Sequence, residues 1–170
     1  MSPSYTEADY ENSIVELFEN LGYQHVYAPE LDHDFYNPLY EAELVSAMHR
    51  INPSMPEDAI SDALFKLKNF ENAELTQKNS IFMDYLQHGI EVRYFVHDQE
   101  KSGLIYLIDY KKPENNSFII ANQWTFIENS QKRPDVLIFL NGLPVVLMEL
   151  KSPSRDQTEI AEGYRQIRNY

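Results

Sequence analysis

The chain has 170 residues, of which 43% are hydrophobic and 13% aromatic, a composition typical of a globular protein and not of a disordered one. Its formal net charge of -13 argues against simple non-specific binding of nucleic acid, because phosphate contacts need a positive surface. The absence of cysteine excludes disulfides and thiolate metal sites. We expect a single domain over residues 1–170 with a substantial core.

Charged residues are distributed unevenly along the chain. Residues 1–129 contain 8 Lys and Arg against 22 Asp and Glu, whereas residues 130–170 contain 6 against 5. A polyanionic substrate would therefore approach the C-terminal part, and we expect a partner or a further domain to supply more positive charge.

The sequence predicts neither a membrane segment nor a signal peptide. No apolar run approaches the roughly 18 residues that cross a bilayer. The first residues are polar and acidic, where a signal peptide would be basic and then apolar. Together with the lack of cysteine, these features are compatible with a cytoplasmic protein, and we expect no membrane partner.

The first predicted element is an amphipathic helix at residues 6–21, where apolar residues recur at helical spacing. Thr6 is placed to cap this helix, with Asp9 three residues further on. Residues 23–36 show no period and are interpreted as a loop that could contain a short strand.

Three further helices are predicted before the pattern changes to β-strands. Asn37-Pro38 is expected to open the first of them, as a cap followed by a proline in the first turn. We expect the three to pack together as a helical insert at about residues 37–88. The predicted helices are 37–50, 57–68 and 74–88.

From residue 90 the sequence predicts strands, because aromatic and β-branched residues gather in short runs between turn-forming clusters. A last helix is predicted from residue 155 or 156 to the chain end. The fold class is therefore α/β. The predicted strands are 90–96, 104–110, 118–127, 136–140 and 145–150.

Three ionisable residues lie within or directly next to the last two predicted strands, which are otherwise apolar. These are Asp135, Glu149 and Lys151. Charges at such positions cost free energy unless something compensates them. Two carboxylates and a lysine on adjacent strands can hold a divalent cation and orient a water for hydrolysis of a phosphodiester, and Mg²⁺ prefers such oxygen ligands. A salt bridge at the strand ends is the alternative.

The metal-site hypothesis constrains the turn between these strands. A plain two-residue loop at Asn141-Gly142 would pair Asp135 with Met148 and place Asp135 and Glu149 on opposite faces. We therefore predict either a three-residue loop with a left-handed Gly142 or a β-bulge, because each would bring both carboxylates to one face.

Several motifs together resemble those of the PD-(D/E)XK nucleases, specifically the N-terminal nuclease domain of the restriction (motor) subunit of type I restriction-modification enzymes. The resemblance covers nearly the whole chain. It is carried by Arg133-Pro134-Asp135, Asn141-Gly142-Leu143-Pro144, Glu149-Leu150-Lys151, Gln166 with Tyr170, Leu21-Gly22-Tyr23, residues 31–35, Asn52-Pro53 and residues 113–116.

The resemblance implies a restriction-endonuclease-like fold, with a mixed β-sheet flanked by helices. It also implies Mg²⁺-dependent cleavage of double-stranded DNA, coupled to ATP-driven translocation. The partners would be the specificity and modification subunits, together with helicase domains in the full chain. Carried over by position, Asp135 and Glu149 would be metal ligands and Lys151 the catalytic lysine.

The resemblance also implies three accessory residues. Gln166 and Tyr170 match the family's QxxxY element, which lies beside the nuclease site, and their spacing places them on one side of the last helix. Glu11 is the candidate for the acid that the first core helix often contributes. Acids near a helix start also complement the helix dipole, which is the alternative for Glu11.

The chain contains no Gly-rich phosphate loop and no helicase motif. We therefore expect it to be a fragment of a larger subunit, with ATP bound only by the full subunit. The alternative function is a nuclease-like module that docks DNA or partner subunits without catalysis. The intact set of two acids and a lysine favours the endonuclease.

Overall fold

The computed structural model describes residues 6–70, 74–127, 130–151, 163–165 and 167–168. The chain forms two compact units, one made of Met1–Tyr40 with Phe118–Tyr170 and the other of Glu41–Ser117. Each unit is considered by itself, and the expectation of a single domain stays a prediction. None of the described helices is long and apolar enough to cross a membrane.

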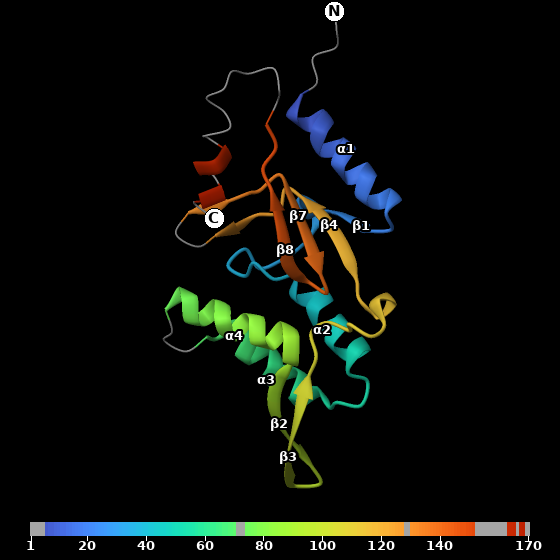
Figure 1. The fold of residues 1–170 in the computed structure, drawn as a ribbon, viewed down its shortest axis with the longest axis vertical. Coiled ribbons are helices and arrows are strands. Elements are labelled where there is room, and N and C mark those ends of the chain that lie inside the picture. The colour runs from blue at the N-terminus through green and yellow to red at the C-terminus, as the bar shows by residue number, and fades with distance from the viewer. Residues whose placement is uncertain (1–5, 71–73, 128–129, 152–162, 166, 169–170) are drawn as a thin grey trace, which may run out of the picture. The chain divides into compact units, whose positions relative to one another are not determined.

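A mixed four-stranded sheet forms the centre of the first unit (Figure 1). Its strand order is β1-β4-β7-β8, with β1 parallel to β4 and the remaining neighbours antiparallel. This sheet, with its helix, confirms the predicted α/β fold class and is consistent with a restriction-endonuclease-like fold. The strands are β1 (Gln24–Tyr27), β4 (Phe118–Asn122), β7 (Val136–Leu140) and β8 (Leu143–Met148).

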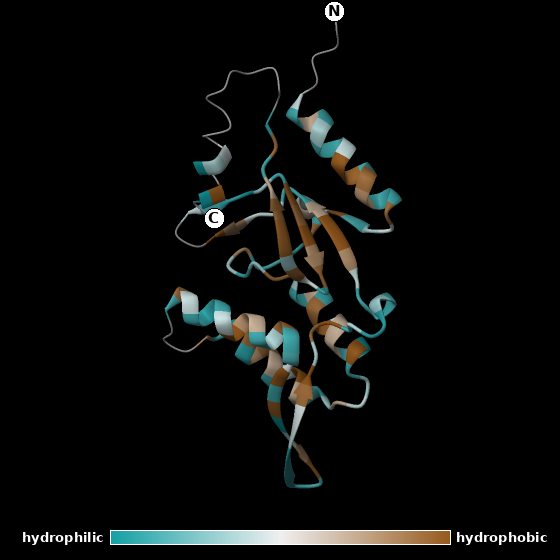
Figure 2. Ribbon diagram, viewed as in Figure 1, coloured by the Kyte–Doolittle hydropathy of each residue, from teal (hydrophilic) through white to brown (hydrophobic). Residues whose placement is uncertain are grey.

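Strands β4, β7 and β8 are hydrophobic along most of their length (Figure 2). Their buried side chains form two clusters, one on each face of the sheet. On one face, Ile120 and Val136 are buried with Val15 of helix α1 (Glu7–Asn20). On the other face, a larger core includes Leu137, Phe139 and Trp124. Its remaining buried members are Ala28, Ile119 and Ala121.

Two short elements complete the described part of this unit. A 3-10 helix, η1 (Ala28–Glu30), follows β1, and a small separate hairpin is formed by β5 (Phe126–Ile127) and β6 (Gln131–Lys132).

Near the C-terminus, residues 163–165 and 167–168 are helical, which agrees with the predicted last helix over that part. The start of that helix lies outside the described residues.

The described residues of the second unit, 41–70 and 74–117, form three helices, a β-hairpin and a short 3-10 helix. Helix α3 packs on β2, and the buried core includes Leu44, Ile60, Ile90 and Ile105. The predicted insert is therefore present, but its compact unit also includes the hairpin. The elements are α2 (Glu41–Ile51), α3 (Glu57–Lys68), α4 (Leu75–His88), β2 (Ile90–Val96), β3 (Gln99–Ile105) and η2 (Pro113–Asn115).

The predicted start of α2 is wrong. The helix begins at Glu41 and not at Asn37-Pro38. The Asn37 side chain instead accepts the backbone N–H of Leu39 at 3.1 Å, which closes a local turn before the helix.

Two strand boundaries also differ from the prediction. The strand predicted at 104–110 is instead β3 at Gln99–Ile105. The hairpin turns at His97 and Asp98, whose φ angles are 51° and 62°, so the return strand begins at Gln99. It ends at Ile105, which pairs with Ile90, the first residue of β2. The single strand predicted at 118–127 is interrupted by Gln123, which has a φ of 58°.

The first helix begins as predicted, with a capping box between Thr6 and Asp9. The Thr6 N–H donates to Asp9 Oδ2 at 2.7 Å, and the Asp9 N–H donates to Thr6 Oγ1 at 3.3 Å. The backbone and side-chain hydrogen bonds from Thr6 lower the pKa of Asp9. The ionised carboxylate is therefore the form that the folded helix start favours.

Replacing Asp9 by asparagine is expected to lower the Tm at neutral pH. Because the folded pKa of Asp9 is lowered, its contribution to stability is present at neutral pH and is lost as the pH falls through that pKa. Thermal unfolding followed by circular dichroism at several pH values measures this. The Glu16→Gln variant, an exposed acid on the same helix, is the control. An Asp9→Asn variant with an unchanged Tm at neutral pH would contradict the assignment.

Candidate active site

The hairpin of β7 and β8 contains a β-bulge. Asn141 and Gly142 form a two-residue loop with φ angles of 52° and 78°, and Leu140 pairs with Leu143. The predicted three-residue loop is therefore wrong. The alternative prediction of a bulge is confirmed, because the register shifts between Ile138 and Phe139.

The bulge changes the parity of every pair beyond it. Val145 is the extra residue, and from there Ile138 lies opposite Val146 and Val136 lies opposite Met148. Asp135 lies one residue before Val136, and Glu149 lies one residue after Met148, so both are one position beyond that last pair. They therefore have equal parity, which a two-residue loop alone would not give. That both carboxylates point to the same side stays a prediction.

Asp135 is half-buried, and both its side chain and its backbone are held. Its Oδ2 accepts the N–H of Leu150 at 2.7 Å, and its carbonyl oxygen accepts the N–H of Gln123 at 3.1 Å. Burial raises the pKa of Asp135, and the negative charges of Glu11 and Glu7 raise it further. The Leu150 hydrogen bond and the charge of Lys151 oppose this increase in the pKa.

Glu11 extends from α1 to the end of β4. Its Oε1 accepts an N–H of the Asn122 side chain at 2.7 Å, and its Oε2 accepts an N–H of the Gln123 side chain at 2.8 Å. The structure therefore places Glu11 at the end of the sheet where Asp135 lies, and the negative charge of Glu11 acts on Asp135. Its position is set by contacts with β4 and not by the helix dipole alone.

One further side chain supports this arrangement. His25 on β1 has its Nε2 3.0 Å from Oδ1 of Asn122. Because the Asn122 nitrogen donates to Glu11, its oxygen faces His25, and His25 Nε2 is assigned as the donor. Sequence reasoning missed His25, Asn122 and Gln123. The available signal was the change from apolar to amide residues at 122–123, directly after a buried strand.

Glu149 and Lys151 are both half-buried and follow β8. The positive charge of Lys151 acts on the Asp135 carboxylate, so the structure brings Lys151 and Asp135 to the same region. Gly163 packs against the Lys151 side chain, because a Cβ at that position would lie 3.7 Å from Lys151 Cγ. Gln166 and Tyr170 lie outside the described residues, and their accessory roles stay predictions.

The residues present fit a hard divalent cation with an incomplete protein shell. In the part of the chain that the structure describes, no three His, Asp or Glu side chains are close enough to hold a metal ion. Mg²⁺ does not require such a cage, since one or two carboxylates with waters and a substrate phosphate suffice. The crowded negative charge at Asp135 is the kind that a cation would relieve.

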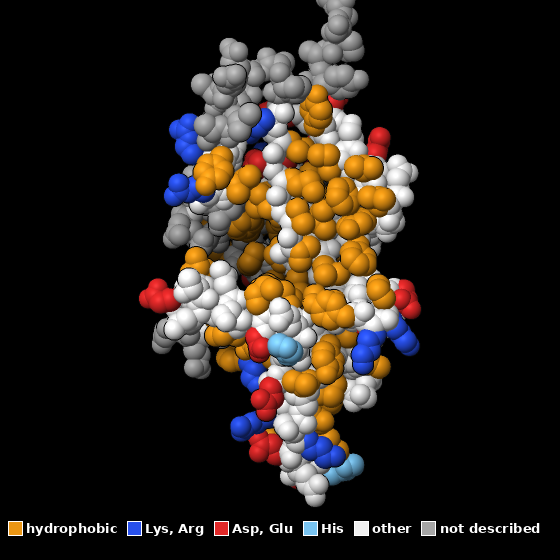
Figure 3. All heavy atoms as spheres, in the orientation of Figure 1, with side chains coloured by type: hydrophobic (Ala, Val, Ile, Leu, Met, Phe, Trp, Pro, Cys, Tyr) orange, Lys and Arg blue, Asp and Glu red, His pale blue; other side chains and the backbone are white. Residues whose placement is uncertain are grey.

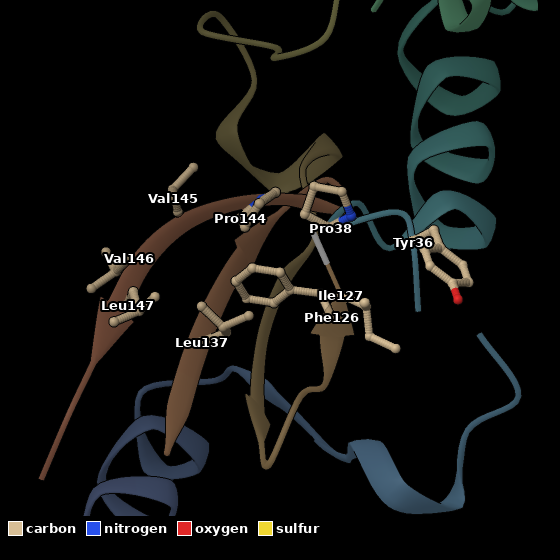
Figure 4. Close-up of a pocket in the computed structure, with 9 residues that line it drawn as sticks. All are labelled: Tyr36, Pro38, Phe126, Ile127, Leu137, Pro144, Val145, Val146 and Leu147. Atoms are coloured by element: carbon tan, nitrogen blue, oxygen red, sulfur yellow. The ribbon is translucent and has the colours of Figure 1, made fainter. Parts of the chain in front are cut away.

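An apolar pocket of about 570 Å³ lies elsewhere in the first unit (Figure 4). Its lining comes from β7, β8 and the segments around residues 36–38 and 126–127, and it includes none of the predicted catalytic residues. The acids and the lysine, and not this pocket, therefore define the candidate site. The lining residues are Tyr36, Pro38, Phe126, Ile127, Leu137, Pro144, Val145, Val146 and Leu147.

Relatives of this chain are named as subunits of restriction enzymes. The chain is 27% identical over 158 residues to a Methanocaldococcus jannaschii protein that is provisionally named the MjaIXP endonuclease subunit of a type I restriction enzyme. It is 26% identical over 174 residues to the type I restriction enzyme HindI endonuclease subunit of Haemophilus influenzae. These matches cover 87% and 96% of this chain, but only 15% and 16% of the relatives.

A family model described as the type I restriction enzyme R protein N terminus matches residues 4–170. This match confirms the resemblance seen in the motifs. The chain spans about a sixth of the length of the two curated relatives above. Because the match covers almost every residue, the chain belongs to the family of N-terminal regions of type I restriction enzyme R proteins.

Proposed function

We propose that this chain is the endonuclease domain of a type I restriction enzyme R subunit, and that it hydrolyses phosphodiester bonds of double-stranded DNA with Mg²⁺. The observation that carries the proposal is the β-bulge, which gives Asp135 and Glu149 equal parity at the ends of two paired strands. Bulges occur on edge strands such as β8 and next to active sites, and this one places Glu149, instead of Met148, opposite Asp135.

In the proposed mechanism, Asp135 and Glu149 hold the divalent ion. The bound ion supplies activation of a water and of the scissile phosphate. The Leu150 N–H fixes one oxygen of Asp135, so that this carboxylate keeps its orientation when DNA arrives. Lys151 supplies an ammonium group to stabilise negative charge on the reacting phosphate. Glu11 contributes a further fixed negative charge beside Asp135.

The charge of the chain indicates that DNA is delivered by other parts of the enzyme. Residues 1–49 contain 10 Asp and Glu and no Lys or Arg, a composition that repels phosphates. Arg133, Arg165 and Arg168 are exposed and could contact phosphates. They lie in the C-terminal part of the sequence, which also contains the candidate site residues. We propose that helicase domains of the full subunit, which bind ATP, and the specificity and modification subunits bring DNA to this domain in the cytoplasm.

Removal of the three charged groups in the full R subunit, assembled with its partner subunits, tests the activity. Asp135→Ala and Glu149→Ala are expected to abolish ATP-dependent cleavage of a plasmid, because each removes a metal ligand. Lys151→Ala is expected to slow cleavage by about 10²–10³-fold, because it removes one group that stabilises the transition state. Gel analysis of plasmid cleavage measures this.

ATP hydrolysis by the same variants is the control, and it is expected to match the unmodified enzyme, because these residues lie outside the motor. Glu16→Ala, an exposed acid on α1, controls for loss of negative charge. Unchanged cleavage in all three site variants would instead favour a docking module without catalysis.

The Asp135→Asn variant of this chain is expected to unfold at a higher temperature than the unmodified chain in a chelating buffer at neutral pH. The substitution removes a charge that burial and the charges of Glu11 and Glu7 disfavour, yet it keeps an oxygen for the Leu150 N–H. Each kcal/mol relieved would raise the Tm by about 2–4 °C. Differential scanning calorimetry measures the change.

The same variant has a defined pH dependence. Because the folded pKa of Asp135 is raised, its ionisation opposes folding above that pKa, so the gain from Asp135→Asn is expected to shrink as the pH falls through it. Mg²⁺ is expected to raise the Tm of the unmodified chain more than that of Asp135→Asn. A lower Tm for Asp135→Asn at neutral pH in chelator would contradict the electrostatic account.

A further inference from the structure

Gln123 adopts a backbone conformation that its residue type rarely adopts. Its φ of 58° lies in the left-handed region. A residue that has a Cβ adopts this conformation at a free-energy cost of roughly 1–2 kcal/mol. Glycine would take this conformation without that cost, and asparagine or aspartate with less of it. The presence of glutamine here indicates that its side chain does something that offsets the strain.

The contacts of Gln123 identify the interactions that offset this backbone strain. Its backbone N–H donates to the carbonyl oxygen of Asp135 at 3.1 Å, and its side-chain amide donates to Oε2 of Glu11 at 2.8 Å. A single residue therefore connects an acid on α1 with the acid that precedes β7. These two acids are 124 positions apart in the sequence.

Asn122 completes the hold on Glu11. Its side-chain amide donates to the other carboxylate oxygen, Oε1, at 2.7 Å. Asn122 is only 7% exposed, and His25 contacts its oxygen at 3.0 Å, so its amide is itself fixed in orientation. Both oxygens of Glu11 are thus held by consecutive amides at the end of β4.

The chemistry of the two donors matters. A lysine or arginine in their place would hold the carboxylate but would also neutralise it and compete with a cation. Amides are neutral donors, so they fix the position of Glu11 and leave its negative charge in place. The charge of Glu11 still acts on Asp135, where it raises the pKa.

We propose that Asn122 and Gln123 form an amide clamp, a pair of positioning residues that holds the Glu11 carboxylate at the end of the sheet where Asp135 lies before a divalent cation arrives. The clamp rests on the proposed nuclease function and extends it to residues that touch neither the cation nor DNA. Pre-set acids bind a cation without first losing side-chain freedom, and loss of such supporting contacts typically costs about 10–100-fold in metal affinity.

The Gln123→Gly variant separates this role from a merely structural one. Glycine relieves the left-handed strain and removes the amide that holds Glu11. The variant is expected to keep a Tm in chelator close to that of the unmodified chain, because the relieved strain offsets the lost hydrogen bond to Glu11. It is expected to bind Mn²⁺ about 10–100-fold more weakly by isothermal titration without DNA. His97→Gly is the matched control, because it relieves another left-handed residue, at φ 51°, in the second unit.

A double-mutant cycle tests whether Gln123 acts through Glu11. If it does, Gln123→Gly is expected to weaken Mn²⁺ binding no further in a chain that already carries Glu11→Gln. Independent, additive losses would overturn the clamp. So would a Gln123→Gly variant with a lower Tm and unchanged Mn²⁺ affinity, since its amide would then only attach α1 to the sheet.

The Asp135→Ala variant, titrated in the same way, separates failure of the clamp from failure of the proposed function. If Asp135→Ala loses Mn²⁺ binding while Gln123→Gly retains it, the clamp alone is overturned. If Asp135→Ala and the unmodified chain give equal titrations, the metal site itself is contradicted, and the clamp with it.

Discussion

The candidate site depends on one extra residue in the hairpin of β7 and β8. The loop at Asn141-Gly142 fixes the first pair of the hairpin, and Val145 shifts all later pairs by one position. Side chains alternate along a strand, so this shift decides whether two acids beyond the hairpin share a side. The hydrophobic faces agree with the shifted register, because Val136 and Met148 contact the same cluster under α1, while Leu137 and Leu147 contact the opposite core.

The site places negative charges together at the cost of stability, as functional sites commonly do. Asp135 is half-buried, and the negative charges of Glu11 and Glu7 act on it. Gln123, whose N–H donates to the Asp135 carbonyl oxygen, has a left-handed backbone. The centre of the sheet is buried, with Ile120, Val136 and Phe139 at 0% exposure, and further hydrophobic side chains gather on the surface of the face shown in Figure 3. Burial of the central side chains provides the stability that lets the strand ends carry charge and strain.

Local patterns in the sequence were sufficient where an element depends on its own residues. The cap of α1 and the bounds of α3 and of β7 could be predicted in this way. The hold of Asn122 and Gln123 on Glu11 could not, because it joins residues more than 110 positions apart. The start of α2 was missed because the Asn37 side chain closes a turn instead of capping a helix.

The central claim is that Asp135 and Glu149 face the same side of the hairpin and together hold a divalent ion. A crystal structure of the chain soaked in Mn²⁺ tests this most directly, since anomalous scattering locates the ion independently of the protein atoms. The account predicts one ion that binds an oxygen of Asp135 and an oxygen of Glu149. Carboxylates on opposite faces of the sheet, or an ion bound away from both, would contradict it.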